Sequence, residues 1–120
     1  MRKVIDVLRT YKSFEGEDII DSEKAPIQLK RILLTYIRNA EKMGLSEHEQ
    51  QEAYNAGFLI AKSDDEKIEL TNSQYNAIKK LSDFGKIKLP NGNEESIFSL
   101  EVKIKTREYV DSAETIDENA

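Results

Sequence analysis

The stretch 70–105, LTNSQYNAIKKLSDFGKIKLPNGNEESIFSLEVKIK, changes its hydrophobic period half-way along, and this change decides the fold class. Before Gly85, the apolar residues Tyr75, Ile78 and Leu81 recur at the spacing of a helix. After Gly85, apolar and polar residues alternate, which is typical of a half-buried strand. A helix followed by paired strands predicts an α+β domain.

Local signals mark both ends of the helix, which we predict at 72–84. Thr71 is a strong N-cap, and Gln74 stands three residues later, so the two can form a capping box. Gly85 can adopt the left-handed conformation that closes a helix.

The residues after this helix predict a C-terminal β-hairpin near 86–106. A short strand, KIKL, is followed by the turn signal Pro-Asn-Gly at 90–92. A longer strand then alternates apolar and polar side chains. Its apolar positions are Phe98, Leu100, Val102 and Ile104, and its polar positions are Ser99, Glu101, Lys103 and Lys105.

Two earlier segments complete a predicted three-helix core, at 27–43 and 46–62. Pro26 suits a first helical position, and Gly44 can terminate the first of these helices. Only two residues separate it from the N-cap Ser46, which predicts an antiparallel helical hairpin. The expected buried side of the second helix consists of Ala53, Tyr54, Gly57, Phe58, Ile60 and Ala61.

The N-terminal segment is compatible with a helix or with a strand. Val4, Val7, Leu8 and Tyr11 have helical spacing, whereas VIDVL at 4–8 is equally typical of a buried strand. Both alternatives stay open.

Acidic residues concentrate at the C-terminal end. The net charge is −5, and residues 108–120 hold five acidic residues with no Lys or Arg. Removing those five from the 23 acidic residues leaves 18, which equals the number of basic residues. We therefore predict a globular domain over 1–107 and a disordered acidic tail over 108–120. The neutral body lacks the charge excess typical of nucleic-acid binders and of DNA mimics.

Length and composition exclude several other classes of protein. The chain of 120 residues supports one modest core, and no apolar run approaches the ~18 residues of a membrane span. The absence of cysteine removes disulfides, thiolate nucleophiles and sulfur-ligated metals. We expect a cytoplasmic protein that does not cross a membrane.

The one histidine, His48, lies in the sequence SEHEQQE and allows two interpretations. With Glu49 and Glu52 it spells H-E-x-x-E, one residue away from a zinc-protease motif. Alternatively, Ser46 and Glu49 form a capping box and the histidine points into solvent. No second histidine is present to complete a zinc site, which favours the helix start. The sequence thus predicts no enzyme, no metal and no cofactor.

One cationic feature suggests a partner-binding surface. If the two predicted strands pair, five cations lie on one outward face of the hairpin. This row is either a solvated sheet face or a patch for a phosphate backbone or an acidic partner. Exposed aromatic residues for base stacking are missing from it, so nucleic-acid binding is the weaker alternative. The five residues are Lys86, Lys88, Lys103, Lys105 and Arg107.

The order of four segments, FEGEDI, KAPIQLKRILLTYI, EQQEAYNAGFLIAKS and KIELTNSQYNAIKKL, resembles a group of small accessory proteins of tailed phages and prophages. The resemblance spans residues 14–81 and consists of core positions, with Gln74 where the pattern often has Glu. It implies a helix in the C-terminal part, where this sequence alternates like a strand. The group carries no established activity, so no site residues follow from it.

These observations predict a non-enzymatic protein–protein interaction module, a phage accessory protein that binds and modulates a host or viral protein. The alternative is a virion or assembly component that associates with itself. We place the contact on the C-terminal hairpin, whose open edge would also allow a homo-oligomer. The tail 108–120 would screen the lysines, so its deletion would strengthen or preserve binding.

Overall fold

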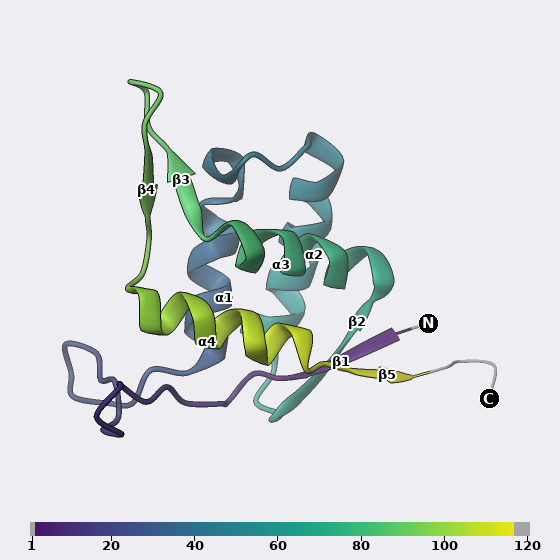
Figure 1. Cartoon of the computed structure of the whole chain (residues 1–120). Helices are drawn as coiled ribbons and strands as arrows, with labels where there is room; N and C mark the ends of the chain where they lie inside the picture. Colours follow the sequence, from purple (N-terminus) through teal and green to yellow (C-terminus); the bar gives the residue numbers. More distant parts are fainter. Residues whose placement is uncertain (1, 117–120) are drawn as a thin grey trace.

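The protein has an α+β fold, as the change of period predicted. The computed structural model describes residues 2–116. These residues form four α-helices, one short 3-10 helix and two small sheets, whose packing Figure 1 shows. In chain order the elements are β1 (Arg2–Asp6), α1 (Leu29–Arg38), the 3-10 helix η1 (Ala40–Met43), α2 (Glu47–Lys62), β2 (Lys67–Thr71), α3 (Asn72–Phe84), β3 (Lys86–Lys88), β4 (Glu94–Ser96), α4 (Leu100–Asp111) and β5 (Glu114–Ile116).

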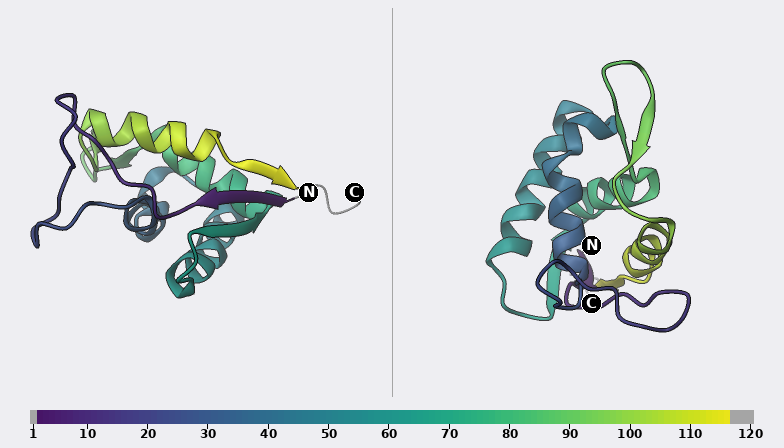
Figure 2. Two further views of the ribbon diagram at one scale, coloured as in Figure 1. Left: turned by 90° about the horizontal axis from the view of Figure 1, so that it is seen from below. Right: turned by 90° about the vertical axis from the view of Figure 1, so that its left-hand side faces the viewer.

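The N-terminal segment, for which the sequence allowed a helix or a strand, forms a strand. β1 is the middle strand of the antiparallel sheet β2-β1-β5, with Ile5 opposite Ile68 and Lys3 opposite Thr115. Because β5 pairs with β1, the two ends of the described chain lie side by side in both views of Figure 2. Residues 10–28 form an irregular excursion at the opposite end of the molecule.

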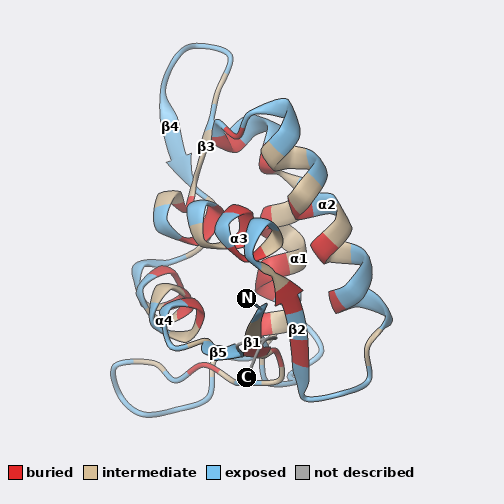
Figure 3. Ribbon diagram, turned by 90° about the vertical axis from the view of Figure 1, so that its right-hand side faces the viewer, coloured by how far each residue is buried: buried red, intermediate tan, exposed pale blue. Residues whose placement is uncertain are grey.

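The core lies between α1, α2, α3 and β2, with α4 packed against α3. Figure 3 shows buried residues on the inward faces of these elements, half-buried residues along β3 and exposed residues along β4. The largest fully buried side chains come from helices, strands and the N-terminal excursion alike. They include Ile5, Tyr11, Leu29, Ile32, Leu33, Tyr36, Ile60, Leu70, Ile78, Leu81 and Val110.

Two of the three predicted helices are confirmed nearly to the residue. Thr71 and Gln74 form the capping box of α3, and Gly85 ends it in the left-handed region at φ 63°. Ser46 and Glu49 form the equivalent box at the start of α2. The third, predicted at 27–43, is divided into α1 and η1.

The predicted long strand is wrong, because residues 100–111 form the helix α4. The hairpin itself is present over 86–96, but its second strand ends at Ser96. Val102, Thr106 and Val110 recur every four residues and are buried, whereas Leu100 and Ile104 are exposed. The Ser99 side chain accepts a hydrogen bond from the backbone N–H of Val102 and so caps the N-terminus of α4. Ser99 as an N-cap residue was the sequence feature that indicated a helix here, against the alternation. The phage-protein resemblance had implied a helix in this part of the chain.

The predicted boundary at 107 is also wrong. Residues 108–111 complete α4, and 114–116 form β5. The Tyr75 hydroxyl donates to the carbonyl oxygen of Val110 at 2.8 Å, which holds the end of α4 against α3. Ordered structure thus continues to 116, and only 117–120 of the predicted disordered tail lie outside the described residues. Among the helices of residues 2–116, none is long and apolar enough to cross a membrane.

Candidate functional site

The segment around His48 forms the capped start of α2. Glu49 accepts from the backbone N–H of Ser46 at 2.9 Å and from Lys80 on α3 at 2.8 Å. The Lys80 hydrogen bond, followed by those from Ser46, lowers the pKa of Glu49 to about 2. The Glu49 carboxylate therefore caps the start of α2 and links this helix to Lys80 of α3. Within residues 2–116, His, Asp and Glu form no group of three or more that is placed to hold a metal ion.

The five predicted cations do not share a sheet face. Lys86 and Lys88 lie on β3, but Lys103, Lys105 and Arg107 lie on α4. Each cation of α4 contacts a different neighbour. Lys105 pairs with Glu108 at 3.1 Å, whereas Arg107 donates to the backbone carbonyls of Ser82 and Asp83 in the last turn of α3. Arg107 thus caps the negative end of that helix.

Lys103 is the one member of the row that is buried, with only 8% of its surface exposed. Its Nζ donates to Ser96 Oγ at 3.1 Å, which ties α4 to the end of the hairpin. Burial, and then the charges of Lys86 and Arg107, lower the pKa of Lys103. The structure therefore brings Lys86, Lys103 and Arg107 together, and it uses Lys103 and Arg107 to hold elements in place. A partner contact through these cations stays a prediction.

The Tyr36 hydroxyl lies beside this cluster and is buried without a hydrogen-bond partner among the described residues. Burial raises the pKa of Tyr36 to about 12. The phenol oxygen and the Lys103 Cε both approach Gly85 so closely that a Cβ there would lie 3.4 Å and 3.0 Å from them. The hydroxyl is thus enclosed by a glycine and an aliphatic stem.

Replacing Tyr36 by Phe is expected to stabilise the fold. An unsatisfied buried donor costs about 1–3 kcal/mol, so Tyr36→Phe should raise the free energy of unfolding by about 1 kcal/mol in a urea titration. Tyr11→Phe is the matched control, because the buried Tyr11 hydroxyl has a partner, Thr106 Oγ1 at 2.7 Å. That variant should lose stability instead. Equal losses in both variants would mean that the Tyr36 hydroxyl is satisfied.

An apolar groove between α1 and α2 is the most distinctive surface of the described chain. It has a volume of about 460 Å³. Tyr54 is 56% exposed and Phe58 48% exposed, and their rings meet edge to face with centroids 4.8 Å apart. The lining residues are Leu34, Ile37, Arg38, Tyr54, Gly57, Phe58 and Ala61.

The predicted buried side of α2 is therefore wrong for Tyr54, Phe58 and Ala61, which are exposed, and Gly57 is only half-buried. The buried stripe of α2 is Ala53, Ala56 and Ile60. Tyr54 and Phe58 lie on the neighbouring stripe, beyond the edge of α1, where no other element of the described chain covers them. The sequence feature that could have indicated this surface is the second apolar stripe on α2, because a helix needs only one apolar stripe to pack against the core.

Charge is distributed unevenly along this groove. At the α2 N-terminus it continues into a hollow of about 330 Å³ whose lining includes the acidic residues Glu41 and Glu47 and the basic Arg38. At the other end of α2, the Lys62 Nζ lies 5.6 Å from the centroid of the Phe58 ring. The surface is therefore apolar in the middle, with an acidic excess at the end of Glu41, Glu47 and Arg38, and with the basic Lys62 at the other end.

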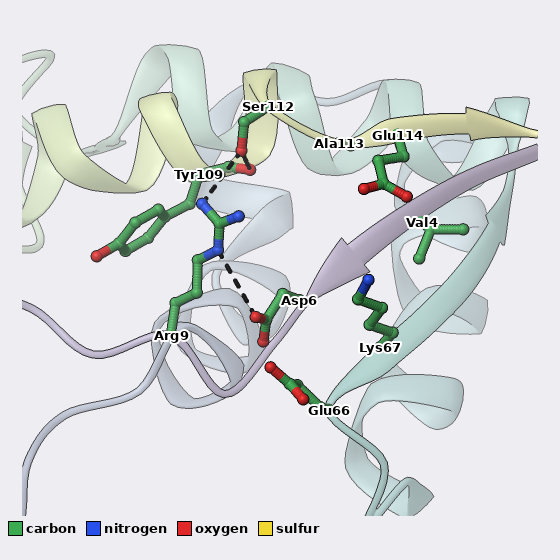
Figure 4. A pocket seen from close by; sticks show the side chains of 9 residues that line it. All are labelled: Val4, Asp6, Arg9, Glu66, Lys67, Tyr109, Ser112, Ala113 and Glu114. Carbon is green, nitrogen blue, oxygen red and sulfur yellow. Dashed lines mark hydrogen bonds and ion pairs between the residues drawn. The ribbon is translucent and has the colours of Figure 1, made fainter.

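A polar pocket of about 260 Å³ lies where β1 and β2 meet the end of α4 (Figure 4). Arg9 crosses it, pairing with Asp6 at 3.8 Å and donating to Ser112 Oγ at 3.3 Å. Its guanidinium also stacks over the Tyr109 ring, 5.1 Å from the centroid. These contacts join the segment after β1 to the end of α4, so Arg9 has a structural role in this pocket.

Comparisons with protein-family models, with curated proteins and with solved structures gave no match for this chain. The function is therefore inferred from the surface of the protein itself.

Proposed function

We propose that this protein is a non-enzymatic interaction module that binds a polypeptide in the groove between α1 and α2. The observation that carries the proposal is the pair Tyr54 and Phe58, two aromatic rings about half exposed on a helix that already buries a separate stripe, Ala53, Ala56 and Ile60, in the core. Protein interfaces are enriched in such residues, which contribute large apolar contacts with few rotatable bonds.

The shape of the groove favours a helical occupant. α1 and α2 run antiparallel (Figure 1) and form the two walls, with Ile37 on one side and Phe58 on the other. Gly57 has no side chain, and a Cβ at this position would lie 3.3 Å from Ile37. The two helices therefore approach closely here, and no side chain of residue 57 fills the groove between them. A third helix with one apolar stripe fits such a floor in the manner of helix-in-groove recognition.

The phage-protein resemblance supports a biological setting for this module. We propose an accessory protein made in the cytoplasm of a phage-infected or lysogenic bacterium, where it binds a host or viral protein. Assembly of virions is the alternative role. Both roles require a protein-binding surface, and the groove supplies one.

Photo-crosslinking from within the groove tests the proposal. The full chain carrying a benzophenone amino acid in place of Phe58 is expressed in its natural host and irradiated, and the adducts are identified by mass spectrometry. We expect an adduct with a polypeptide, because an occupant of the groove would lie against this side chain. Position 59 provides the matched control, since Leu59 is 44% exposed on the same helix but does not line the groove.

A polypeptide adduct from position 58 and none from position 59 supports the proposal. The proposal is overturned if position 58 yields no adduct, or if both positions yield the same adducts at the same level. Equal adducts from both positions would mean that the crosslinked polypeptide contacts the exposed surface of α2 in general and does not bind in the groove.

A further inference from the structure

The proposed function leaves the occupant of the groove unnamed, and the charges along α2 identify one. We infer that the occupant is a second copy of this chain, related by a twofold axis, with the α2 helices of the two copies antiparallel. The inference rests on the proposed function and deepens it.

The groove-facing stripe of α2 has opposite charges at its two ends. Glu47 begins the helix and Lys62 ends it. Within residues 2–116 neither of them forms an ion pair with another side chain. An antiparallel second copy places its Lys62 opposite Glu47, and the symmetry repeats that pair at the other end. A parallel copy would place like charges together, which is unfavourable.

The middle of the stripe is suited to a symmetry axis. In sequence, the midpoint between Glu47 and Lys62 falls between Tyr54 and Asn55. The two copies of Tyr54 therefore meet near the axis, with one Phe58 on each side. An interface around a twofold axis uses the same patch on both chains, so the patch has to complement itself. An apolar, aromatic centre with one acidic and one basic end meets this condition.

The two pairs of helices would form a four-helix arrangement across the interface. In each copy α1 and α2 are antiparallel neighbours, and the second copy covers their common outer face. This arrangement removes the half-exposed rings of Tyr54 and Phe58 from water, which is the main favourable contribution to association. The charged pairs at the ends fix the orientation and contribute less, because they lie at the rim.

Sedimentation velocity of the purified full chain over a concentration series, up to about 1 mM, measures the association directly. We expect a species of twice the 13.8 kDa of one chain. Phe58→Asp should convert it to monomer at every concentration, because it places two charges near the centre of the interface. Leu59→Asp, which adds the same charge one position along the same helix, should remain dimeric.

A charge-reversal cycle tests the antiparallel register and uses only exposed rim positions. Glu47→Lys and Lys62→Glu should each weaken the dimer about tenfold, since each replaces two attractive contacts by two repulsive ones. The double variant Glu47→Lys/Lys62→Glu restores both pairs with their signs exchanged. Its dissociation constant should return to within about threefold of the original.

The inference is overturned if the chain is monomeric throughout, if Phe58→Asp remains dimeric, or if the double reversal is weaker than both single reversals. A monomer that crosslinks from position 58 to a different protein leaves the proposed function standing and removes this inference alone. A monomer without any such adduct removes both.

Discussion

Deleting residues 108–120 is expected to unfold the protein at ambient temperature. This is the opposite of the result that a disordered, charge-screening tail predicts. The reason is that the deleted segment contains part of the core. Val110 is fully buried, and Tyr109 packs edge to face on Tyr11 with centroids 5.4 Å apart.

The deletion also removes partners from residues that remain. β1 loses β5 on one of its two edges. The hydroxyl of Tyr75, a buried residue, loses its acceptor, the carbonyl oxygen of Val110. Burial of a valine and of most of a tyrosine contributes about 1.5–3 kcal/mol each, and an orphaned buried hydroxyl costs a further 1–3 kcal/mol or so. The total approaches the whole stability of a small domain, about 5–15 kcal/mol.

Circular dichroism during a thermal scan measures the effect, and a charge-only variant is the control. Glu108→Gln/Asp111→Asn removes two acidic charges, with their surface pairs to Lys105 and Lys79, but leaves the packing in place. Its melting temperature should change by no more than a few degrees, because exposed pairs contribute little. A truncated chain that still melts cooperatively near the temperature of the full chain would show that the end of α4 is dispensable.

Tyr11→Ala is expected to lower the free energy of unfolding by about 3–5 kcal/mol. Tyr11 is fully buried and connects the N-terminal excursion to α4. Its hydroxyl lies 2.7 Å from Thr106 Oγ1. Thr106 in turn donates to the carbonyl oxygen of Val102, so its oxygen accepts the proton of Tyr11.

The variant Tyr11→Phe separates packing from hydrogen bonding. It keeps the ring in contact with Tyr109 and leaves the Thr106 hydroxyl with its own acceptor, so its cost should be about 1 kcal/mol. Urea unfolding of both variants measures the difference. If Tyr11→Phe costs as much as Tyr11→Ala, the hydrogen bond rather than the buried ring holds the excursion to α4.

The same phenol makes the fold sensitive to alkali. Burial raises the pKa of Tyr11 far above its ordinary value. In the unfolded state Tyr11 releases its proton at the ordinary tyrosine pKa of about 10, whereas in the folded state it retains that proton. Its contribution to stability is complete below about pH 10 and is lost above it, by at most ~1.4 kcal/mol per pH unit. Tyr11→Phe should therefore lose less stability than the original protein between about pH 10 and 12. If the two proteins lose the same amount of stability over this pH range, the ionisation of Tyr11 does not cause the alkaline destabilisation.

The sequence by itself determined the elements whose signals are local. α3 begins at its capping box, Thr71 with Gln74, and ends at Gly85, and α2 begins at the box of Ser46 with Glu49. A capping box satisfies the first backbone N–H groups of a helix with side chains three residues apart. Such contacts do not depend on what packs against the helix, so residue order alone reveals them.

Only the tertiary structure decided the remaining features. The run 98–105 fits a strand by its alternation, and it became a helix because Val102, Thr106 and Val110 meet buried neighbours at helical spacing. On α2, contact with α1 and α3 buries Ala53, Ala56 and Ile60 and leaves Tyr54 and Phe58 at the surface. The physical reason is the same in both cases. Apolar spacing shows which side chains can be buried, whereas distant elements of the chain determine which of them are.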